Sequence, residues 1–196
     1  MRKYELKARA EKQAATRRRI VEATSALHEE VGPARTTVAE IARRAGVQRL
    51  TVYTHFPNES ELFDACGQHW MDRHSPPDPS ASLAIGNPDE RLRAVLGPLY
   101  RWYRKNARTI ENLQRDRLVM PAFDAVMRIR MDQQFTNLTD ALASRYAPQG
   151  GRAKAMRAAV ALALDFWTWR RLAGERMSDE AAAALMAGAV KAAAHD

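Results

Sequence analysis

A short run of arginine, leucine, threonine, tyrosine and histidine side chains could contact the bases and phosphates of DNA. An arginine can donate paired hydrogen bonds to guanine, and leucine and threonine methyl groups can meet the methyl group of thymine. Tyrosine hydroxyl and histidine imidazole groups can hold phosphate oxygens. The run comprises Gln48, Arg49, Leu50, Thr51, Tyr53, Thr54 and His55.

Helical spacing predicts that most of these side chains do not pack in the protein's own core. At 100° per residue, Val52 and Phe56 share one face of a helix that begins near residue 48 or 49 and ends before Pro57. Leucine and tyrosine then lie on the opposite face, which is unfavourable in water unless something covers it. The major groove of DNA would cover it. The alternative is an ordinary helical hairpin whose exposed residues bind nothing.

The segment that precedes this helix predicts another short helix, which would hold it in position. Its apolar residues recur at i, i+3, i+4 and i+7, so they form one stripe. Thr36 or Thr37 can cap its first turn through a hydroxyl oxygen, and Gly46 supplies the backbone freedom of a tight turn before Val47. The stripe consists of Val38, Ile41, Ala42 and Ala45.

A longer helix before this pair completes a predicted three-helix core. It stops at Gly32 and Pro33, and its apolar repeat is expected to pack on Ile41, Val52 and Phe56. The repeat consists of Ile20, Ala23, Leu27 and Val31.

The amino-terminal residues hold most of the surplus positive charge. Residues 1–19 contain eight Lys or Arg and two Glu, a net charge of +6 out of +8 for the chain. Residues 1–16 are expected to be a disordered basic arm, and Arg17 and Arg18 to contact phosphates beside the helix pair. A solvated tail without a role is the alternative.

The helix pair and its flanks, roughly residues 17–65, resemble the DNA-binding domain of the TetR family of bacterial repressors. The resemblance implies that Thr51 and Tyr53 contact bases or phosphates, and that Thr37 and His55 contact phosphates. It rests on Thr37, Ile41, Ala42, Ala45, Gly46, Val47, Thr51, Val52, Tyr53, His55 and Phe56.

Two positions depart from the family pattern. Glu59 stands where the family usually has a lysine that reaches the DNA backbone, which puts one phosphate contact in doubt. Leu50 replaces a small residue or proline, which suggests an apolar contact in the groove and a different preferred DNA sequence.

The remainder of the chain predicts an all-α protein. We expect a helix-turn-helix domain over residues 17–60, a connecting helix over 61–75, and a helical bundle over 76–196 for ligand binding and dimerisation. Helices are expected over 89–105, 109–119, 121–146, 152–173 and 179–194, with a kink at residue 98 and a loop at 148–151.

Alanine is abundant in the last two predicted helices, which allows close helix packing, although alanine is also simply a good helix former. The family resemblance implies that these helices form a homodimer interface. It also implies a pocket for a small-molecule effector of unknown identity, which either releases the protein from its operator or promotes binding. The candidate ligand residues are Trp102, Arg117, Met120, Phe123, Met127, Phe166 and Trp169.

The composition and motifs of the chain also bear on other classes of protein. The lone Cys66 excludes an internal disulfide, and we interpret it as a buried structural thiol, with a redox sensor as the alternative. Neither a phosphate-binding glycine loop nor a catalytic motif occurs, so we expect no enzyme, no cofactor and no metal site. The longest uncharged apolar run is too short to cross a membrane. We therefore expect a cytoplasmic regulator that binds double-stranded DNA, with a sequence-tolerant architectural DNA-binding protein as the alternative.

Overall fold

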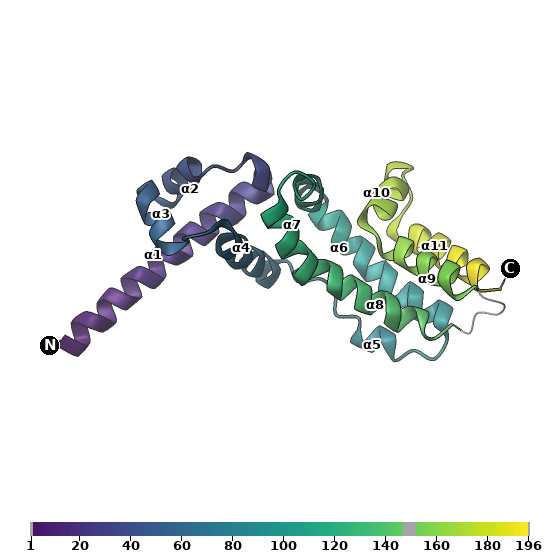
Figure 1. Ribbon diagram of the computed structural model, residues 1–196. Coiled ribbons are helices and arrows are strands. Elements are labelled where there is room, and N and C mark those ends of the chain that lie inside the picture. Colours follow the sequence, from purple (N-terminus) through teal and green to yellow (C-terminus); the bar gives the residue numbers. More distant parts are fainter. Residues whose placement is uncertain (1, 147–151, 196) are drawn as a thin grey trace. The chain divides into compact units, whose positions relative to one another are not determined.

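The computed structural model describes residues 2–146 and 152–195 of the chain (Figure 1), and within them every regular element is a helix. The expectation of an all-α fold is confirmed. The chain divides into two compact units, one holding Met1–Ser75 and Arg108–Met127, the other Pro76–Ala107 and Arg128–Asp196. The sequence predicts one boundary near residue 75, whereas the chain returns to the first unit for residues 108–127. Among the described helices, none is long and apolar enough to cross a membrane.

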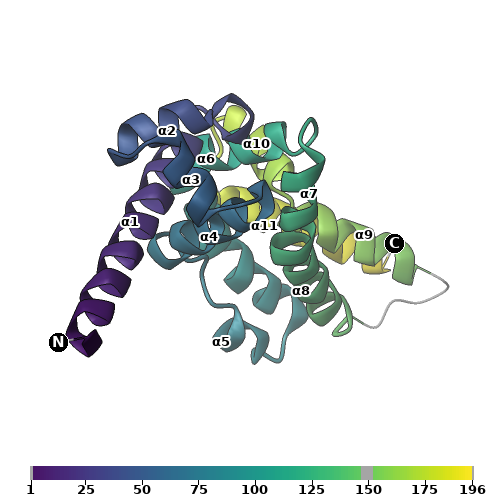
Figure 2. The same cartoon turned by 60° about the vertical axis from the view of Figure 1, so that its left-hand side comes forward.

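The first unit is a helical domain with one added segment from later in the chain, Arg108–Met127. In both views α2 and α3 lie beside the second half of α1 (Figures 1 and 2). The elements are α1 (Arg2–Glu30), η1 (Pro33–Arg35), α2 (Val38–Ala45), α3 (Arg49–His55), α4 (Glu59–Arg73), α7 (Pro121–Met127) and the end of α6 (Pro88–Asp116).

The structure continues α1 back to Arg2, whereas the sequence analysis predicts a disordered arm over residues 1–16. No glycine or proline occurs between residues 2 and 31, and Ala, Lys, Arg, Glu and Gln, which are strong helix formers, dominate the segment. Local propensity is therefore sufficient for a helix here. Residues 4–15 are exposed and bury no apolar face.

The core of the first unit contains the residues predicted for it, with one correction. Val31 is 36% exposed, because α1 ends at Glu30 and Val31 lies in the turn before Gly32, whose φ is +91°. The predicted residue Val47 packs on the core while partly buried. The buried cluster is Ile20, Val21, Ala23, Leu27, Ile41, Ala42, Ala45, Val52, Phe56, Leu62 and Cys66.

Cys66 is buried in this cluster, where its thiol lies 3.7 Å from the carbonyl oxygen of Val21. Burial raises the pKa of the Cys66 thiol to about 12, so the reactive thiolate is scarce at neutral pH. These observations favour the structural interpretation of this cysteine over a redox sensor.

The second unit is a helical bundle whose boundaries differ from the predicted ones. The two helices expected over 89–105 and 109–119 form one helix, α6, and the helix expected over 121–146 is interrupted by a π-helical segment, η2. The predicted loop at 148–151 lies outside the described residues. The elements are α5 (Ser80–Leu83), the first part of α6, η2 (Arg128–Asp132), α8 (Gln133–Ala143), α9 (Ala153–Leu164), α10 (Phe166–Gly174) and α11 (Asp179–His195).

The helix predicted over 152–173 is divided at Asp165. This residue ends α9 and caps α10, because its carboxylate accepts a hydrogen bond from the amide of Thr168 at 2.9 Å. The last carbonyl groups of α9 are satisfied by two tyrosines of α6. Tyr100 donates to Ala163 and Tyr103 to Leu164, each at 2.7 Å. The chain can therefore turn here without leaving buried carbonyls unsatisfied.

Candidate DNA-binding interface and effector pocket

The turn between α2 and α3 fixes the direction in which α3 leaves α2. Thr37 caps α2 by accepting a hydrogen bond from the amide of Glu40 at 3.2 Å. Gly46 has φ +65°, the left-handed region, and the amide of Val47 donates back to the carbonyl of Ala42 at 3.0 Å. This is the Schellman arrangement, which favours glycine at the left-handed position. A single glycine in the sequence therefore determines where this turn lies.

Helix α3 anchors itself through Val52 and Phe56, which are 2% and 3% exposed. Leu50 and Tyr53 on the opposite side are 73% and 52% exposed. The prediction that the helix presents these two side chains to solvent is confirmed. A helix of seven residues thus exposes two large side chains that its own domain does not use.

The other predicted DNA contacts are available to different degrees. Arg18, Gln48 and Arg49 are exposed, and Thr51 and His55 are half-buried. The hydroxyl of the exposed Thr54 donates within the helix to Leu50 at 2.9 Å, so it retains its acceptor capacity. The DNA contacts themselves stay predictions.

Arg17 is already engaged within the unit. Its guanidinium lies 4.0 Å from the centre of the Phe56 ring and donates to the carbonyl of His55 at 3.3 Å. A cation at the carboxyl end of a helix is favoured by the helix dipole, and a cation over an aromatic ring is favoured by the ring quadrupole. Arg17 therefore holds the end of α3 in place, a role that the sequence analysis does not predict.

Glu59 occupies the first turn of α4. The preceding Asn58 caps this helix by accepting from the amide of Glu61 at 2.9 Å and donating to its carboxylate at 2.7 Å. A carboxylate in the first turn is favoured by the helix dipole. Glu59 thus has a favourable structural role at the start of α4 that does not depend on DNA.

The end of α1 is held by side chains from the far end of α6, which also belong to the first unit. Arg108, Asn112 and Arg115 donate to the carbonyls of residues 30, 29 and 31 at 2.9, 3.2 and 3.0 Å. These carbonyls belong to the last turn of α1 and the residue after it, where α-helical partners are lacking. We call these three residues and Asp116 the α6 clamp.

Asp116 is the buried member of the α6 clamp, 2% exposed. Its carboxylate accepts from the amide of Ala34 at 2.9 Å and from Arg115 at 2.6 Å. A Cβ atom on Gly32 would overlap the same carboxylate, so this position requires glycine for space as well as for its positive φ.

His28 is buried beside the α6 clamp. Burial lowers its pKa from 6.5 to about 4, and the nearby charge of Asp116 opposes that shift only in part. The imidazole is therefore neutral at neutral pH.

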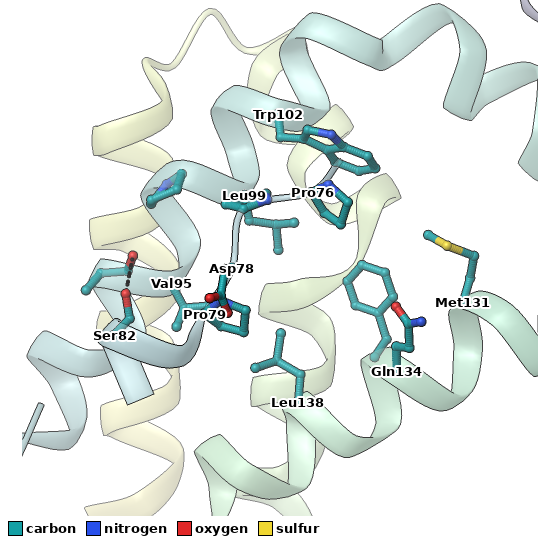
Figure 3. A pocket seen from close by; sticks show the side chains of 14 residues that line it. Pro76, Asp78, Pro79, Ser82, Val95, Leu99, Trp102, Met131, Gln134 and Leu138 are labelled. Carbon is teal, nitrogen blue, oxygen red and sulfur yellow. Dashed lines mark hydrogen bonds between the residues drawn. The ribbon is translucent and has the colours of Figure 1, made fainter. Parts of the chain in front are cut away.

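A pocket in the second unit lies between α5, α6 and α8 (Figure 3), with about 780 Å³ of empty space including its open mouth. The cavity itself measures about 190 Å³, which is smaller than the roughly 300–1,000 Å³ of drug-sized ligand sites. The side chains from α6 recur with helical spacing, and so do those from η2 and α8, so one face of each helix forms a wall. The lining residues are Pro76, Pro77, Asp78, Pro79, Ser82, Ala94, Val95, Pro98, Leu99, Trp102, Met131, Gln134, Phe135 and Leu138.

Pro98 explains how the segment before α6 attaches to this wall. Proline lacks an amide hydrogen, so within α6 it leaves the carbonyl of Ala94 without its helical partner. The hydroxyl of Ser82 donates to that carbonyl at 3.2 Å, as the dashed line in Figure 3 shows. The helical defect is therefore the attachment point of α5.

The residues predicted to bind a ligand do not gather at this pocket. Of that set, Trp102 lines it. Phe123 and Met127 are buried in the first unit, Arg117 donates to Asp124 at 2.8 Å, and Met120 is half-buried before α7. Ligand contacts by these four residues stay predictions.

Phe166 and Trp169 pack on Tyr103 in the core of the second unit, with ring centres 5.3 and 5.7 Å from the tyrosine ring. Trp169 also donates to Asp179 at 3.0 Å, and Arg104 donates to the same carboxylate. Burial alone would raise the pKa of Asp179, but these hydrogen bonds outweigh it and hold the pKa below its ordinary value. This geometry gives both aromatic residues a structural role, whereas their ligand contacts stay untested.

The alanine-rich helices leave one apolar face uncovered. Figures 1 and 2 both show α9 and α11 side by side. The exposed residues of α11 with small or apolar side chains recur at i, i+3, i+4, i+7, i+8 and i+11, so they share one face. They are Ala181, Ala184, Leu185, Gly188, Ala189 and Ala192.

The first unit has the geometry of a helix-turn-helix DNA-binding domain: a three-helix core, a glycine turn and an exposed second helix. The family model "Bacterial regulatory proteins, tetR family" matches residues 20–66. This region of the chain is therefore similar to the DNA-binding domain of that family.

Curated relatives match part of the chain. The chain is 48% identical over 50 residues to the HTH-type transcriptional regulator TtgR of Pseudomonas putida, covering 26% of this chain and 24% of the relative. It is 33% identical over 82 residues to the HTH-type transcriptional regulator BetI of Yersinia pestis, covering 40% and 41%. The match thus spans about a quarter to two fifths of the relatives' length.

Solved structures resemble the chain over most of its length. A tetR-family transcriptional regulator from Streptomyces coelicolor aligns with a TM-score of 0.61 at 19% identity, covering 91% of this chain and 79% of the other. A putative TetR-family regulator from Mesorhizobium loti aligns with a TM-score of 0.62 at 19% identity, covering 92% and 96%. At this identity the likeness defines the fold.

Proposed function

We propose that this protein is a sequence-specific transcriptional regulator that binds a palindromic operator as a homodimer and is released from it by a small molecule. The observation that carries the proposal is the exposed face of α3, where Leu50 and Tyr53 project from a helix anchored on the opposite side. Leu50 would contact a thymine methyl group and Arg49 a guanine. Its place of action is then the cytoplasm, where bacterial DNA lies.

Selection of bound fragments from random duplex DNA tests this proposal. We expect a palindromic consensus whose half-sites are about 34–36 Å apart, one turn of DNA. Arg49→Ala and Leu50→Ala should each relax the consensus at one position per half-site, at a cost of about 1–3 kcal/mol. An architectural DNA-binding protein would instead enrich no consensus, and both variants would bind random duplexes like the wild type.

The exposed face of α11 supports the homodimer. Gly188 lies on that face, and a Cβ atom there would meet nothing within 4 Å of its own subunit. Gly188→Trp should therefore leave the fold intact and convert the dimer to a monomer in light scattering, with loss of operator binding. Gly174→Trp is the matched control, because that glycine is equally open and lies on α10. A dimeric Gly188→Trp protein would contradict this interface.

Helix α6 supports a coupling between ligand and DNA. One part of it, including Leu99 and Trp102, lines the pocket, and its last turns form the α6 clamp on the end of α1. A ligand that favours a different geometry of α6 must change DNA affinity by the same coupling free energy, typically about 1–3 kcal/mol. Activation by the ligand has the same thermodynamic form, and release of a labelled operator on ligand addition distinguishes the two.

A further inference from the structure

We propose that the pocket between α5, α6 and α8 binds a hydrophobic aromatic molecule that carries a positive charge. The inference rests on the proposed function, in which this pocket holds the effector. It adds the chemical class of that effector, argued from the residues of the pocket.

The walls of the pocket are almost entirely apolar. Proline, alanine, valine, leucine, methionine, phenylalanine and tryptophan side chains make up all but three of the lining residues. The polar ones are Asp78, Ser82 and Gln134. Such a lining takes most of its binding free energy from the burial of apolar ligand surface.

Asp78 supplies the only charge among the lining residues. One oxygen of its carboxylate accepts from the amide and the hydroxyl of Ser80 at 3.0 and 2.6 Å. These hydrogen bonds lower the pKa of Asp78, so the carboxylate stays ionised at neutral pH. Its second oxygen remains available to a cation at the mouth, and no arginine or lysine among the lining residues could neutralise an anionic ligand.

Two aromatic rings add a second preference for a cation. Trp102 projects from α6 beside the cavity (Figure 3), and Phe135 of α8 also lines it. The negative face of an aromatic ring attracts a cation, and offset stacking favours a flat aromatic ligand. A delocalised cation satisfies the rings and the carboxylate together.

The segment that carries Asp78 is held in a restricted conformation. Pro76, Pro77 and Pro79 restrict its backbone, and the bond from Ser82 to Ala94 attaches its end to α6. The carboxylate is thus partly positioned before a ligand arrives, which reduces the entropy lost on binding.

Three probes of similar shape and different charge test the inference: N-methylquinolinium, methylnaphthalene and naphthoate. Calorimetric titration of the full-length protein should rank the cation above the neutral probe, and naphthoate last. Equal affinities for the cation and the neutral probe, or the tightest binding for naphthoate, would overturn the assignment of charge.

Asp78→Asn isolates the carboxylate, because an asparagine oxygen can still accept the bonds from Ser80. We expect N-methylquinolinium affinity to fall about two- to fivefold, as for an exposed ion pair, with methylnaphthalene affinity unchanged. Glu90→Gln is the control, since it removes the same charge from an exposed position on α6 outside the pocket. Equal effects of both variants on the cation would contradict a role for Asp78.

Phe135→Ala tests whether the probe binds in this pocket, because this half-buried ring borders the cavity. It should weaken both the cation and the neutral probe. Unchanged binding of both would overturn the pocket as the site. Failure of the proposed function is a separate result: binding with the expected charge preference but no probe-dependent change in operator affinity would leave the ligand class intact and remove the regulatory role.

Discussion

The exposed face of α3 and the pocket of the second unit are encoded in opposite ways. The exposed face belongs to a helix of seven consecutive residues, which is anchored by Val52 within it and by Phe56 directly after it. The pocket comes from segments near residues 76–82, 94–102 and 131–138, none of which forms a site alone. A candidate interface on one helix can therefore be found from periodicity, whereas a cavity depends on tertiary packing.

The first unit also depends on residues that are distant in the sequence. The end of α1 is held by the α6 clamp, more than 75 residues further along the chain. Thus the recognition surface is locally encoded, but part of its support is not.

Trp169→Ala should have the largest effect. Trp169 is 2% exposed and bonded to Asp179, so we expect the free energy of unfolding to fall by about 3–5 kcal/mol in chemical denaturation. Trp167→Ala is the control, because Trp167 is 49% exposed on the same helix. A stable Trp169→Ala protein that has lost only its ligand response would restore Trp169 as a ligand contact.

The pH dependence of stability should report His28. Its pKa is about 4 in the folded protein against an ordinary 6.5, so between these values the unfolded state binds the extra proton. Stability from the neutral imidazole is present above pH 6.5 and is lost as the pH falls towards 4, by up to about 3 kcal/mol. His28→Gln should flatten this part of a denaturation series. An identical slope in the variant would place the titration elsewhere.

Substitutions of Arg17 and Arg18 should distinguish structural support of α3 from contact with DNA. Arg17→Ala removes the cation over Phe56 and should lower the free energy of unfolding by about 1 kcal/mol. Arg18→Ala should leave stability unchanged and reduce the slope of log affinity against log salt by about 0.9. If both variants change the slope equally, Arg17 also leaves its intramolecular site to bind phosphate.

Glu59→Lys should give the smallest effect. The substitution removes a favourable acid from the first turn of α4, at about 0.3–1 kcal/mol of stability, and adds a cation where the family usually has one. We expect operator affinity to rise a few-fold and the salt slope to steepen by about 0.9. Unchanged DNA binding would show that this position lies away from the phosphates.

The sequence predicts the first unit well because its helices are short, amphipathic and separated by clear stop signals. Ile41, Val52 and Phe56 are buried as the spacing predicts, and the turn at Gly46 has the left-handed backbone that it implies. Val31 follows the same repeat but lies beyond the end of the helix, since periodicity alone does not locate a helix end to one residue.

The second unit is harder to predict. The polar stretch near Asn106 and Arg108 suggests a break between two helices, but Asn106 bonds within the helix to the carbonyl of Trp102, and Arg108 bonds to the end of α1. These polar side chains therefore have partners inside a continuous helix and beyond it. The pocket differs from the predicted one because Phe166 and Trp169 pack in the core, whereas prolines line much of the cavity.

The bond between Ser82 and Ala94 implies a non-additive pair of substitutions. Ser82→Ala strands a carbonyl only while position 98 lacks an amide hydrogen; in a Pro98→Ala background the helix supplies that donor itself. A double-mutant cycle should therefore return an interaction energy of about 0.5–3 kcal/mol, although the two side chains belong to different helices. The serine and the proline are thermodynamically one unit, and neither can be exchanged during engineering of this pocket without reference to the other.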